Sequence, residues 1–515
     1  MEVSELRQVR RNLDRFLRRF EDCIKMKPTR RHLRTYVRGQ VSDLERKSVE
    51  PMALEAGVAP RTLQEFLGLH RWDHEALRRR VREVIQRDHG DQNAIAVVDE
   101  TGCPKKGDKT AGVQRQYCGA TGKTDNCVVT VHLGYATSEF HALVDSDLYL
   151  PRETWHEDRE RCREAGIPDE VVYRPKWRIA LELLQRAIEG GMSFRFLAAD
   201  EEYGAKPEFR QGVAGLGLTC VVEVPCSTFG WTKKPRVTAP GPYSGRGRPR
   251  RHVGLAPGAP RPRRVDQLWS RRGPCWQAFH IKDTENGPVV WEVRAGRFFP
   301  SEKGLPTEEC RLLVARNTTD GEVKYFLSNA ALRSAPAFAK PASAGARASQ
   351  RSAASQSSKG RSQSTSAPED IPTEVLLHVA FSRSHIERLF QDAKMHIGFD
   401  HFEVRRYLPL VRHMIVSLVS LLFLMKETNR LRGEKSLVER APGAPGGRSA
   451  ARSRDVAAGT HAPAKEDCRD HRIRPTSAST CRQVTQENPT ANPASPRLLR
   501  VQTPEVLRPA VALSC

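Results

Sequence analysis

The chain has 515 residues, enough for roughly three domains of about 150 residues each. Only 38% of the residues are hydrophobic, and 84 basic residues against 61 acidic ones give a formal net charge of +23. A field of this sign favours a polyanionic partner such as nucleic acid. The twelve cysteines include no Cys-x-x-Cys pair. This excludes the usual zinc spacings and a compact disulfide framework, so we expect reduced thiols in a cytoplasmic protein.

The hydropathy pattern predicts no membrane segment. The N-terminus (MEVSELRQVRRNLDRF) is charged and lacks the apolar core of a signal peptide. The longest apolar run spans residues 414–425, whereas a membrane span needs roughly 20 residues. We therefore expect this run to be a buried helix, and we expect no membrane as a partner.

Residues 1–90 are predicted to form a helical domain that binds DNA. Within it, residues 52–67 (MALEAGVAPRTLQEFL) have the rhythm of a helix-turn-helix, with Gly57 at the turn and Leu63 and Phe66 anchoring the second helix. Such a helix can enter the major groove, where its side chains reach base edges. A plain helical hairpin is the alternative interpretation. The predicted DNA contacts on the exposed side of the second helix are Arg61, Thr62 and Gln64.

Residues 91–225 change to alternating strands and helices. The predicted strands are Ala94–Thr101, Asn126–Tyr135, Phe140–Val144, Phe194–Ala199 and Leu218–Val224, and the predicted helices are Arg178–Glu189 and Pro207–Leu216. Three strands, then a helix, a strand, a helix and a strand, is the order of a ribonuclease-H-like sheet. We therefore expect an α/β fold in which this region forms the first part of a ribonuclease-H-like core.

The rest of the chain divides into four predicted segments. Residues 226–333 form an extended basic loop, up to residue 265, followed by a β-rich insertion. The insertion strands are Trp276–Ile281, Val289–Arg294, Leu312–Arg316 and Tyr325–Leu327. Residues 334–370 are a low-complexity linker and 433–515 a disordered basic tail, because neither can bury enough apolar surface to order itself. Helical pattern returns in residues 371–432 and completes the core.

Two of the predicted strands run directly into an aspartate. Asp99 follows the apolar run of the first strand, and Asp200 follows the strand that ends at Ala199. A strand buried on both faces holds a carboxylate rigidly at its end, where the ligand sites of α/β sheets lie. Aspartate also ends strands simply as a turn residue, so a functional role needs further support.

That support comes from the helix predicted over residues 381–398 (FSRSHIERLFQDAKMHIG). At helical spacing its apolar stripe consists of Ile386, Leu389, Phe390, Ala393 and Ile397. The charged residues that share a narrow line beside this stripe are Arg383, Glu387 and Lys394, and those on the opposite, solvated side are His385, Arg388 and Asp392. A glutamate between two cations at the margin of the core suits a metal ligand, and the cations could hold phosphates of a bound strand. A solvated salt-bridge face is the alternative.

The sequence resembles the bacterial insertion-sequence DDE transposases whose glutamate lies in a Tyr-Arg-Glu-Lys helix. Their helix spaces Tyr-x2-Arg-x3-Glu-x6-Lys, and Arg383, Glu387 and Lys394 match the last three positions, whereas Ala380 stands at the tyrosine position. The segment VVDETGCPKKG resembles the motif of the first aspartate and LAADEEYG that of the second. The match runs from about residue 10 to 430.

The resemblance implies the chemistry of the site. Asp99, Asp200 and Glu387 would bind two Mg²⁺ ions, for which Mn²⁺ can substitute, and Arg383 and Lys394 would complete the catalytic set. In-line cleavage and joining of phosphodiesters calls for two ions about 4 Å apart, and Mg²⁺ prefers carboxylate oxygens. The implied partners are double-stranded DNA, as transposon ends and as target, and a second copy of the chain in the DNA complex. The implied location is the bacterial cytoplasm, at the nucleoid.

A glycine-rich segment after the first aspartate does not fit a nucleotide-binding loop. In Gly102–Thr110 (GCPKKGDKT) the two glycines have the spacing of a phosphate-binding loop, but Asp108 occupies the position of the required lysine. We expect Lys105 and Lys106 to contact DNA phosphates instead.

Two other functions remain open from the sequence. A ribonuclease-H-like nuclease that cuts without strand transfer would have the same active site. A catalytically degenerate DNA-binding protein derived from a transposase is the second alternative, because the tyrosine is missing and two segments are of low complexity. The second alternative is disfavoured because the sequence retains all the motif residues that carry charge, namely Asp99, Asp200, Glu387, Arg383 and Lys394.

Overall fold

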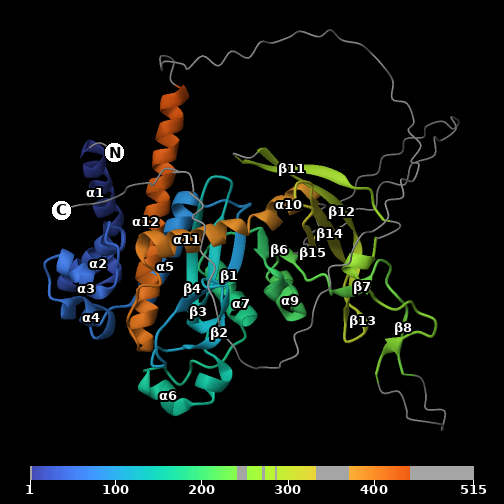
Figure 1. Ribbon diagram of the computed structural model, residues 1–515, viewed down its shortest axis with the longest axis horizontal. Coiled ribbons are helices and arrows are strands. Elements are labelled where there is room, and N and C mark those ends of the chain that lie inside the picture. The colour runs from blue at the N-terminus through green and yellow to red at the C-terminus, as the bar shows by residue number, and fades with distance from the viewer. Residues whose placement is uncertain (1–2, 241–251, 270–272, 285–286, 332–370, 441–515) are drawn as a thin grey trace, which may run out of the picture. The chain divides into compact units, whose positions relative to one another are not determined.

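A computed structural model of the protein describes residues 3–240, 252–269, 273–284, 287–331 and 371–440 (Figure 1). The predicted linker at 334–370 and residues 441–515 of the predicted tail lie outside these ranges. The tail was predicted to begin at residue 433, but residues 433–440 continue a helix that starts at Tyr407, so this boundary was wrong. Nine cysteines fall within the described ranges, and all nine are free thiols.

The chain begins with helices. They are α1 (Val3–Arg18), the 3-10 turn η1 (Glu21–Cys23), α2 (Lys27–Gln40), α3 (Val49–Glu55), α4 (Pro60–Gly68) and α5 (His74–His89). In α1 the apolar side chains recur at helical spacing, and Leu13 and Leu17 are almost completely buried. Asp73 caps α5, since its carboxylate accepts a hydrogen bond from the backbone N–H of Ala76 at 2.9 Å.

A mixed sheet follows the helices. Its first strands are β1 (Ile95–Pro104), β2 (Gln114–Cys118), β3 (Lys123–Ala136) and β4 (His141–Leu148), followed later by β5 (Phe196–Ala199) and β6 (Thr219–Glu223). β1 pairs antiparallel with β3 and parallel with β5; β3 pairs antiparallel with β4, and β5 pairs parallel with β6. The five strands predicted in this region are confirmed. β2 was not predicted.

Helices cover both faces of these strands. The π-helical turn η2 (Arg152–His156) and α6 (Arg159–Glu164) precede α7 (Lys176–Glu189), and α8 (Glu201–Gly204) and α9 (Pro207–Gly215) separate β5 from β6. The later helices are α10 (Thr373–Phe381), α11 (Ser384–Ile397) and α12 (Tyr407–Arg440). α11 contacts β1 and β4, whereas α7 contacts β1, β3 and β4. The helices predicted at 178–189 and 207–216 are confirmed.

The β-rich insertion continues the same sheet. Its strands are β7 (Phe229–Trp231), β10 (Arg263–Arg264), β11 (Gln277–Thr284), β12 (Gly287–Glu302), β13 (Leu305–Pro306), β14 (Cys310–Asn317) and β15 (Val323–Ser328). β15 pairs antiparallel with β6, so the described strands of core and insertion form one 13-stranded sheet. A separate ribbon pairs β8 (Val237–Thr238) with β9 (Gly254–Leu255). The four predicted insertion strands are confirmed.

The loop predicted over residues 226–265 contains strands where the structure describes it. β7 and β10 pair with each other, and β7 also pairs with β12. Trp231 is buried, and its indole N–H donates to the carbonyl of Pro260 at 2.7 Å. The prediction of a simple extended loop was therefore wrong. A few apolar side chains and backbone pairing to a longer strand outweigh the turn-forming composition.

α12 lies beside the N-terminal helices (Figure 1), and its residues 410–425 are largely buried. The hydroxyl of Tyr36 lies 2.8 Å from Nδ1 of His413, and Gln40 donates to Ser417 at 2.8 Å. α12 is long and apolar enough to cross a membrane, but 83% of its most apolar window is buried inside the described protein. The prediction of a buried helix at 414–425 is thus confirmed.

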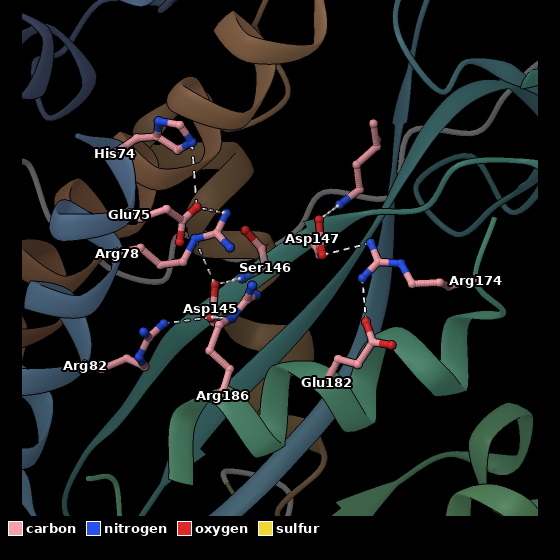
Figure 2. A network of polar contacts seen from close by, with 11 residues as sticks. His74, Glu75, Arg78, Arg82, Asp145, Ser146, Asp147, Arg174, Glu182 and Arg186 are labelled. Atoms are coloured by element: carbon pink, nitrogen blue, oxygen red, sulfur yellow. Dashed lines mark hydrogen bonds and ion pairs between the residues drawn. The ribbon is translucent and has the colours of Figure 1, made fainter. Parts of the chain in front are cut away.

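A buried ion cluster ties α5 to β4 and α7 (Figure 2). Asp145 of β4 is completely buried. Its carboxylate accepts hydrogen bonds from Arg82 of α5 at 2.8 Å and from Arg186 of α7 at 3.0 Å. Arg78 of α5 lies 3.4 Å from the other carboxylate oxygen. A single carboxylate therefore faces three guanidinium groups, two of them with side chains only 5% and 4% exposed.

Candidate active site

Asp99 and Asp200 occupy neighbouring positions in the sheet. Asp99 does not end its strand as predicted, because β1 continues to Pro104 and pairs with β3 along this stretch. The parallel pairing of β1 with β5 aligns Val98 with Ala199, so Asp99 and Asp200 are the next residues of two neighbouring strands. Both strands are almost entirely buried up to this point because they consist of Ile, Val, Leu, Phe and Ala. Apolar strands flanked by helices thus carry both carboxylates to the same place at one end of the β1–β5 pair.

Burial and mutual repulsion dominate the electrostatics of the pair. Loss of water raises the pKa of Asp99 to about 8, and the neighbouring charge of Asp200 acts in the same direction. Burial also raises the pKa of Asp200, opposed by Arg383 and by backbone hydrogen bonds. Because the two negative charges repel each other, Asp99 and Asp200 do not readily ionise together unless a positive charge is added.

The side chain of Asp200 has a fixed orientation. It caps the short helix α8 by accepting hydrogen bonds from the backbone N–H groups of Glu202 at 3.0 Å and Tyr203 at 3.3 Å. Both bonds use the same oxygen, Oδ1. The chain turn that follows β5 therefore orients the carboxylate.

Arg383 joins the aspartates to the glutamate of α11. One guanidinium nitrogen lies 3.2 Å from Oδ2 of Asp99, and the other lies 2.6 Å from Oε1 of Glu387. Two carboxylates from β1 and α11 are thus within the reach of one side chain, and the Asp200 charge also acts on Arg383. The side chain of Glu387 is 49% exposed, so the cluster opens to solvent on the α11 side.

The predicted apolar stripe of α11 is confirmed. Its five members are all buried, and Ile386 approaches the sheet at Gly134 of β3. Lys394, predicted on the charged line, donates from Nζ to the carbonyl of Gly102 at 3.0 Å. Ala380, at the tyrosine position of the motif, is buried near the end of α10, before the break at Ser382 that separates α10 from α11.

The opposite side of α11 is less solvated than predicted. Asp392 is buried, and the prediction that it is solvated was wrong. Arg388 and His396, one turn away on either side, lie 3.1 Å and 3.8 Å from its carboxylate and cover it. His385 is only partly exposed because its ring stacks on His141 of β4, with ring centroids 4.9 Å apart.

A polar network lies behind the aspartates. Glu100 follows Asp99 and points to the opposite face of β1. Its two oxygens accept hydrogen bonds from Nζ of Lys176 and from the hydroxyl of Tyr203, each at 2.6 Å. Lys176 also lies 2.9 Å from Glu202. Neither Lys176 nor Tyr203 was predicted as a site residue. Lys176 carries no local signal, whereas Tyr203 belongs to the LAADEEYG motif.

The predicted DNA-contacting residues lie on α4, the second helix of the predicted helix-turn-helix formed by α3 and α4. Gly57, with φ of +65°, makes the turn between α3 and α4, and Leu63 and Phe66 are completely buried. Arg61 is 82% exposed on its side chain and pairs with Glu65 one turn away at 2.6 Å. Gln64 is exposed and Thr62 partly so. The three side chains therefore lie on the outer part of α4.

The two lysines after β1 differ in their surroundings. Lys105 donates to the backbone carbonyls of Asp400 at 2.9 Å and Phe402 at 2.8 Å, and its Nζ lies 3.4 Å from the centre of the Phe402 ring. Burial lowers its pKa. Lys106 is exposed. Lys105 thus holds the segment that follows α11, and Lys106 is the better placed of the two for an outside partner.

The residues present fit a divalent cation. Asp99, Asp200 and Glu387 supply hard oxygen donors, the type that Mg²⁺ prefers. No cage of three or more His, Cys, Asp or Glu side chains is already assembled in the part of the chain that the structure describes. A cationic group, Arg383, instead bridges Asp99 and Glu387. The carboxylates of Asp99 and Glu387 therefore already share one positive charge, that of Arg383.

Comparison with known proteins identifies the family of the chain. The chain belongs to the DDE superfamily endonucleases, whose family model matches residues 19–288, just over half of its length. The matched region includes Asp99 and Asp200, and Glu387 lies beyond it. The chain is also 37% identical over 169 residues to the probable transposase for insertion sequence element IS701 from Microchaete diplosiphon. That alignment covers 32% of this chain and 41% of the relative, well under half of either protein.

Proposed function

We propose that the protein is a DNA transposase that cuts at the ends of an insertion sequence and joins those ends to target DNA. The observation that carries the proposal is the arrangement of carboxylates from distant segments around Asp99. Asp99 and Asp200 directly follow the paired residues Val98 and Ala199, and Arg383 links Asp99 to Glu387. The relative's name, a probable transposase, supports the same activity.

Asp99, Asp200 and Glu387 are the proposed ligands of two Mg²⁺ ions, for which Mn²⁺ can substitute. Two such ions about 4 Å apart polarise the attacking and leaving oxygens of a phosphodiester. Glu100 and Glu202 are excluded as ligands in this proposal, because Lys176 contacts both carboxylates and Tyr203 also donates to Glu100. Glu201 is also excluded in this proposal, because its side chain is exposed to solvent.

The other site residues have roles that follow from their positions. Arg383, between two of the carboxylates, would remain beside the cluster and offer its guanidinium to the scissile phosphate, a geometry that suits arginine better than lysine. Lys394 sits on the same side of α11 and would hold a neighbouring phosphate. The exposed Lys106 is a third candidate for the DNA backbone.

The sheet order supports the finer part of the fold proposal. Strands β4, β3, β1, β5 and β6 lie next to one another in this order, with β5 and β6 parallel to β1 and β3 antiparallel to it. We propose that these strands and their helices are a ribonuclease-H-like core. The helical region before β1, with α3 and α4, is the proposed reader of the terminal DNA. Two copies of the chain would act together, at the bacterial nucleoid.

The test of the activity uses DNA that carries both boundaries of the genetic element encoding the protein. Purified protein is incubated with end-labelled DNA, a target plasmid and Mg²⁺ or Mn²⁺, and products are separated by denaturing electrophoresis. Cleavage at the boundaries with labelled ends joined to the target is the expected result. Cleavage without joined products would favour the nuclease, and binding without cleavage under either ion would favour the degenerate DNA-binding protein.

The role of α4 gives a separate prediction. Replacing Arg61 or Gln64 by alanine should weaken binding to the terminal DNA about ten-fold, since a specific base contact is worth ~1–3 kcal/mol. Binding to unrelated DNA should change much less, because phosphate contacts carry it. Fluorescence anisotropy with both DNAs measures the ratio. The matched control is Arg152→Ala, which removes an exposed arginine paired with Glu157 outside α3 and α4. Equal losses on both DNAs would contradict sequence reading by α4.

A further inference from the structure

The two proposed ligand aspartates lie just past the backbone pairing between β1 and β5. That pairing ends at Val98 and Ala199, one residue before Asp99 and Asp200, although Asp99 itself stays paired with His132 of β3. No β1–β5 pairing therefore joins the two aspartates to each other. Two ions about 4 Å apart need the distance between the carboxylates held closely. Side-chain contacts between the segments that follow the two aspartates would hold that distance.

The network around Glu100 makes such contacts. Glu100 is the residue after Asp99, and Tyr203 lies in the short helix that Asp200 caps. The Tyr203 hydroxyl donates to Oε2 of Glu100 at 2.6 Å. This bond joins the segment that follows the first aspartate directly to the segment that follows the second.

Lys176 makes the same connection a second time. Its Nζ lies 2.6 Å from Oε1 of Glu100 and 2.9 Å from Glu202. Lys176 is the first residue of α7, so a third element is fastened to both segments. Charge-assisted bonds of this length are the stronger kind of hydrogen bond.

Burial restricts the Tyr203 part of the connection. Tyr203 is completely buried, and its ring packs on Phe209 of α9 with centroids 5.5 Å apart. Both oxygens of the Glu100 carboxylate have a donor. A buried hydroxyl that donates to a carboxylate with both oxygens satisfied has few alternative arrangements.

We propose that Tyr203 and Lys176 are positioning residues: acting through Glu100, they set the separation of Asp99 and Asp200 and so the affinity for divalent ions. The inference rests on the proposed function, since it takes the two aspartates as metal ligands. Partners that orient metal ligands typically change metal affinity by about 10–100-fold when they are removed. A network that served stability alone would leave this affinity unchanged.

The test measures metal binding without DNA and without turnover. Free Mn²⁺ is followed by electron paramagnetic resonance during titration of the full chain. Tyr203→Phe, which removes only the hydroxyl, should weaken Mn²⁺ binding about ten-fold. Lys176→Gln should weaken it similarly, and Lys176→Arg should restore part of the loss because it keeps the charge.

A matched control separates positioning from stability. Tyr36→Phe removes an equally buried hydroxyl, which lies 2.8 Å from Nδ1 of His413. This contact joins α2 to α12 and includes neither of the strands that precede the aspartates. Both Tyr→Phe variants should lower the unfolding temperature to a similar extent, but only Tyr203→Phe should change Mn²⁺ affinity. Equal Mn²⁺ affinity in the two variants would overturn the positioning role. If Tyr203→Phe does not fold, Lys176→Gln and Lys176→Arg take its place, and their Mn²⁺ affinities are compared with that of Tyr36→Phe.

One further comparison keeps the two proposals distinguishable. Asp99→Asn removes a proposed ligand while retaining the shape of the side chain. Wild-type protein that binds Mn²⁺ no better than Asp99→Asn would overturn the metal site, and the positioning proposal with it. Wild-type binding that is lost in Asp99→Asn but retained in Tyr203→Phe and Lys176→Gln would overturn the positioning proposal alone.

Discussion

Asp99→Ala, Asp200→Ala and Glu387→Ala should each reduce Mg²⁺-dependent cleavage of the element's ends by about a thousand-fold or more. Stabilisation of a phosphodiester transition state by metal ions amounts to several kcal/mol, and each 1.36 kcal/mol is about ten-fold in rate. DNA affinity should survive or rise slightly, since each change removes negative charge near phosphates. Lys394→Ala should have an intermediate effect on cleavage, as the residue is proposed to hold a phosphate.

Glu201→Ala is the matched control for this series. Glu201 directly follows Asp200 in the chain, but its side chain is exposed, so its removal should leave cleavage within about two-fold of wild type. Rates are measured under single-turnover conditions, and DNA binding is measured separately with each variant. Undiminished cleavage by Glu387→Ala would rule out the proposed site, whatever the aspartate variants show.

Asp145→Asn should destabilise the fold by about 3–5 kcal/mol, the usual cost of breaking a buried ion pair from one side. The change keeps the shape of the side chain but removes the charge that Arg78, Arg82 and Arg186 share (Figure 2). Arg78 and Arg82 cannot turn toward water, because almost all of their side-chain surface is buried. Like charges would then face one another at the junction of α5, β4 and α7.

Chemical denaturation followed by tryptophan fluorescence measures the loss. Glu403→Gln is the control, because Glu403 pairs with Arg46 at the surface, where both side chains are more than half exposed. Such a pair contributes about 0–1 kcal/mol. A denaturation midpoint for Asp145→Asn that matches that of Glu403→Gln would show that the cluster contributes little. Asp145→Asn should also leave Mn²⁺ affinity unchanged if the protein remains folded at the temperature of the titration.

The elements that the sequence predicted well have strong local signals. β5 and the first part of β1 are short apolar runs that are followed directly by an aspartate, and the stripe of α11 repeats at the helical period. Each of these patterns is complete within a few residues, because burial on one or both faces imposes it directly. The structure confirms the strands and the buried stripe.

Features that depend on distant partners were not predicted. β2 has the sequence QRQYC, in which Cys118 is the single buried position, too little to indicate a strand, and β2 forms by pairing with β3. The pairing of Arg383 with Asp99 joins residues 284 positions apart, and no periodic pattern signals such a contact. Lys105 was expected to face DNA, but it donates to the carbonyls of Asp400 and Phe402. This contact forms because the segment after α11 lies next to the end of β1, which the local sequence around Lys105 does not indicate.

For the candidate site, the sequence indicated the carboxylates but not the contacts around them. The identity of Asp99, Asp200 and Glu387 came from strand ends, a helical line and a family motif, and their roles remain predictions. The network of Lys176 and Tyr203 with Glu100 could be recognised only in three dimensions, because its members come from β1, α7 and α8. A sequence identifies reactive groups more readily than the groups that hold them in place.

The pairing of β15 with β6 has a consequence for the solubility of the protein. Strands that continue a sheet from its edge follow its hydrogen-bonding direction and twist. Excising them would leave β6 with unpaired N–H and C=O groups, the kind of edge that recruits other chains into aggregates. A trimmed protein lacking residues 226–333 should therefore be poorly soluble, even if its carboxylates were intact. The insertion thus protects the sheet edge that β6 would otherwise expose.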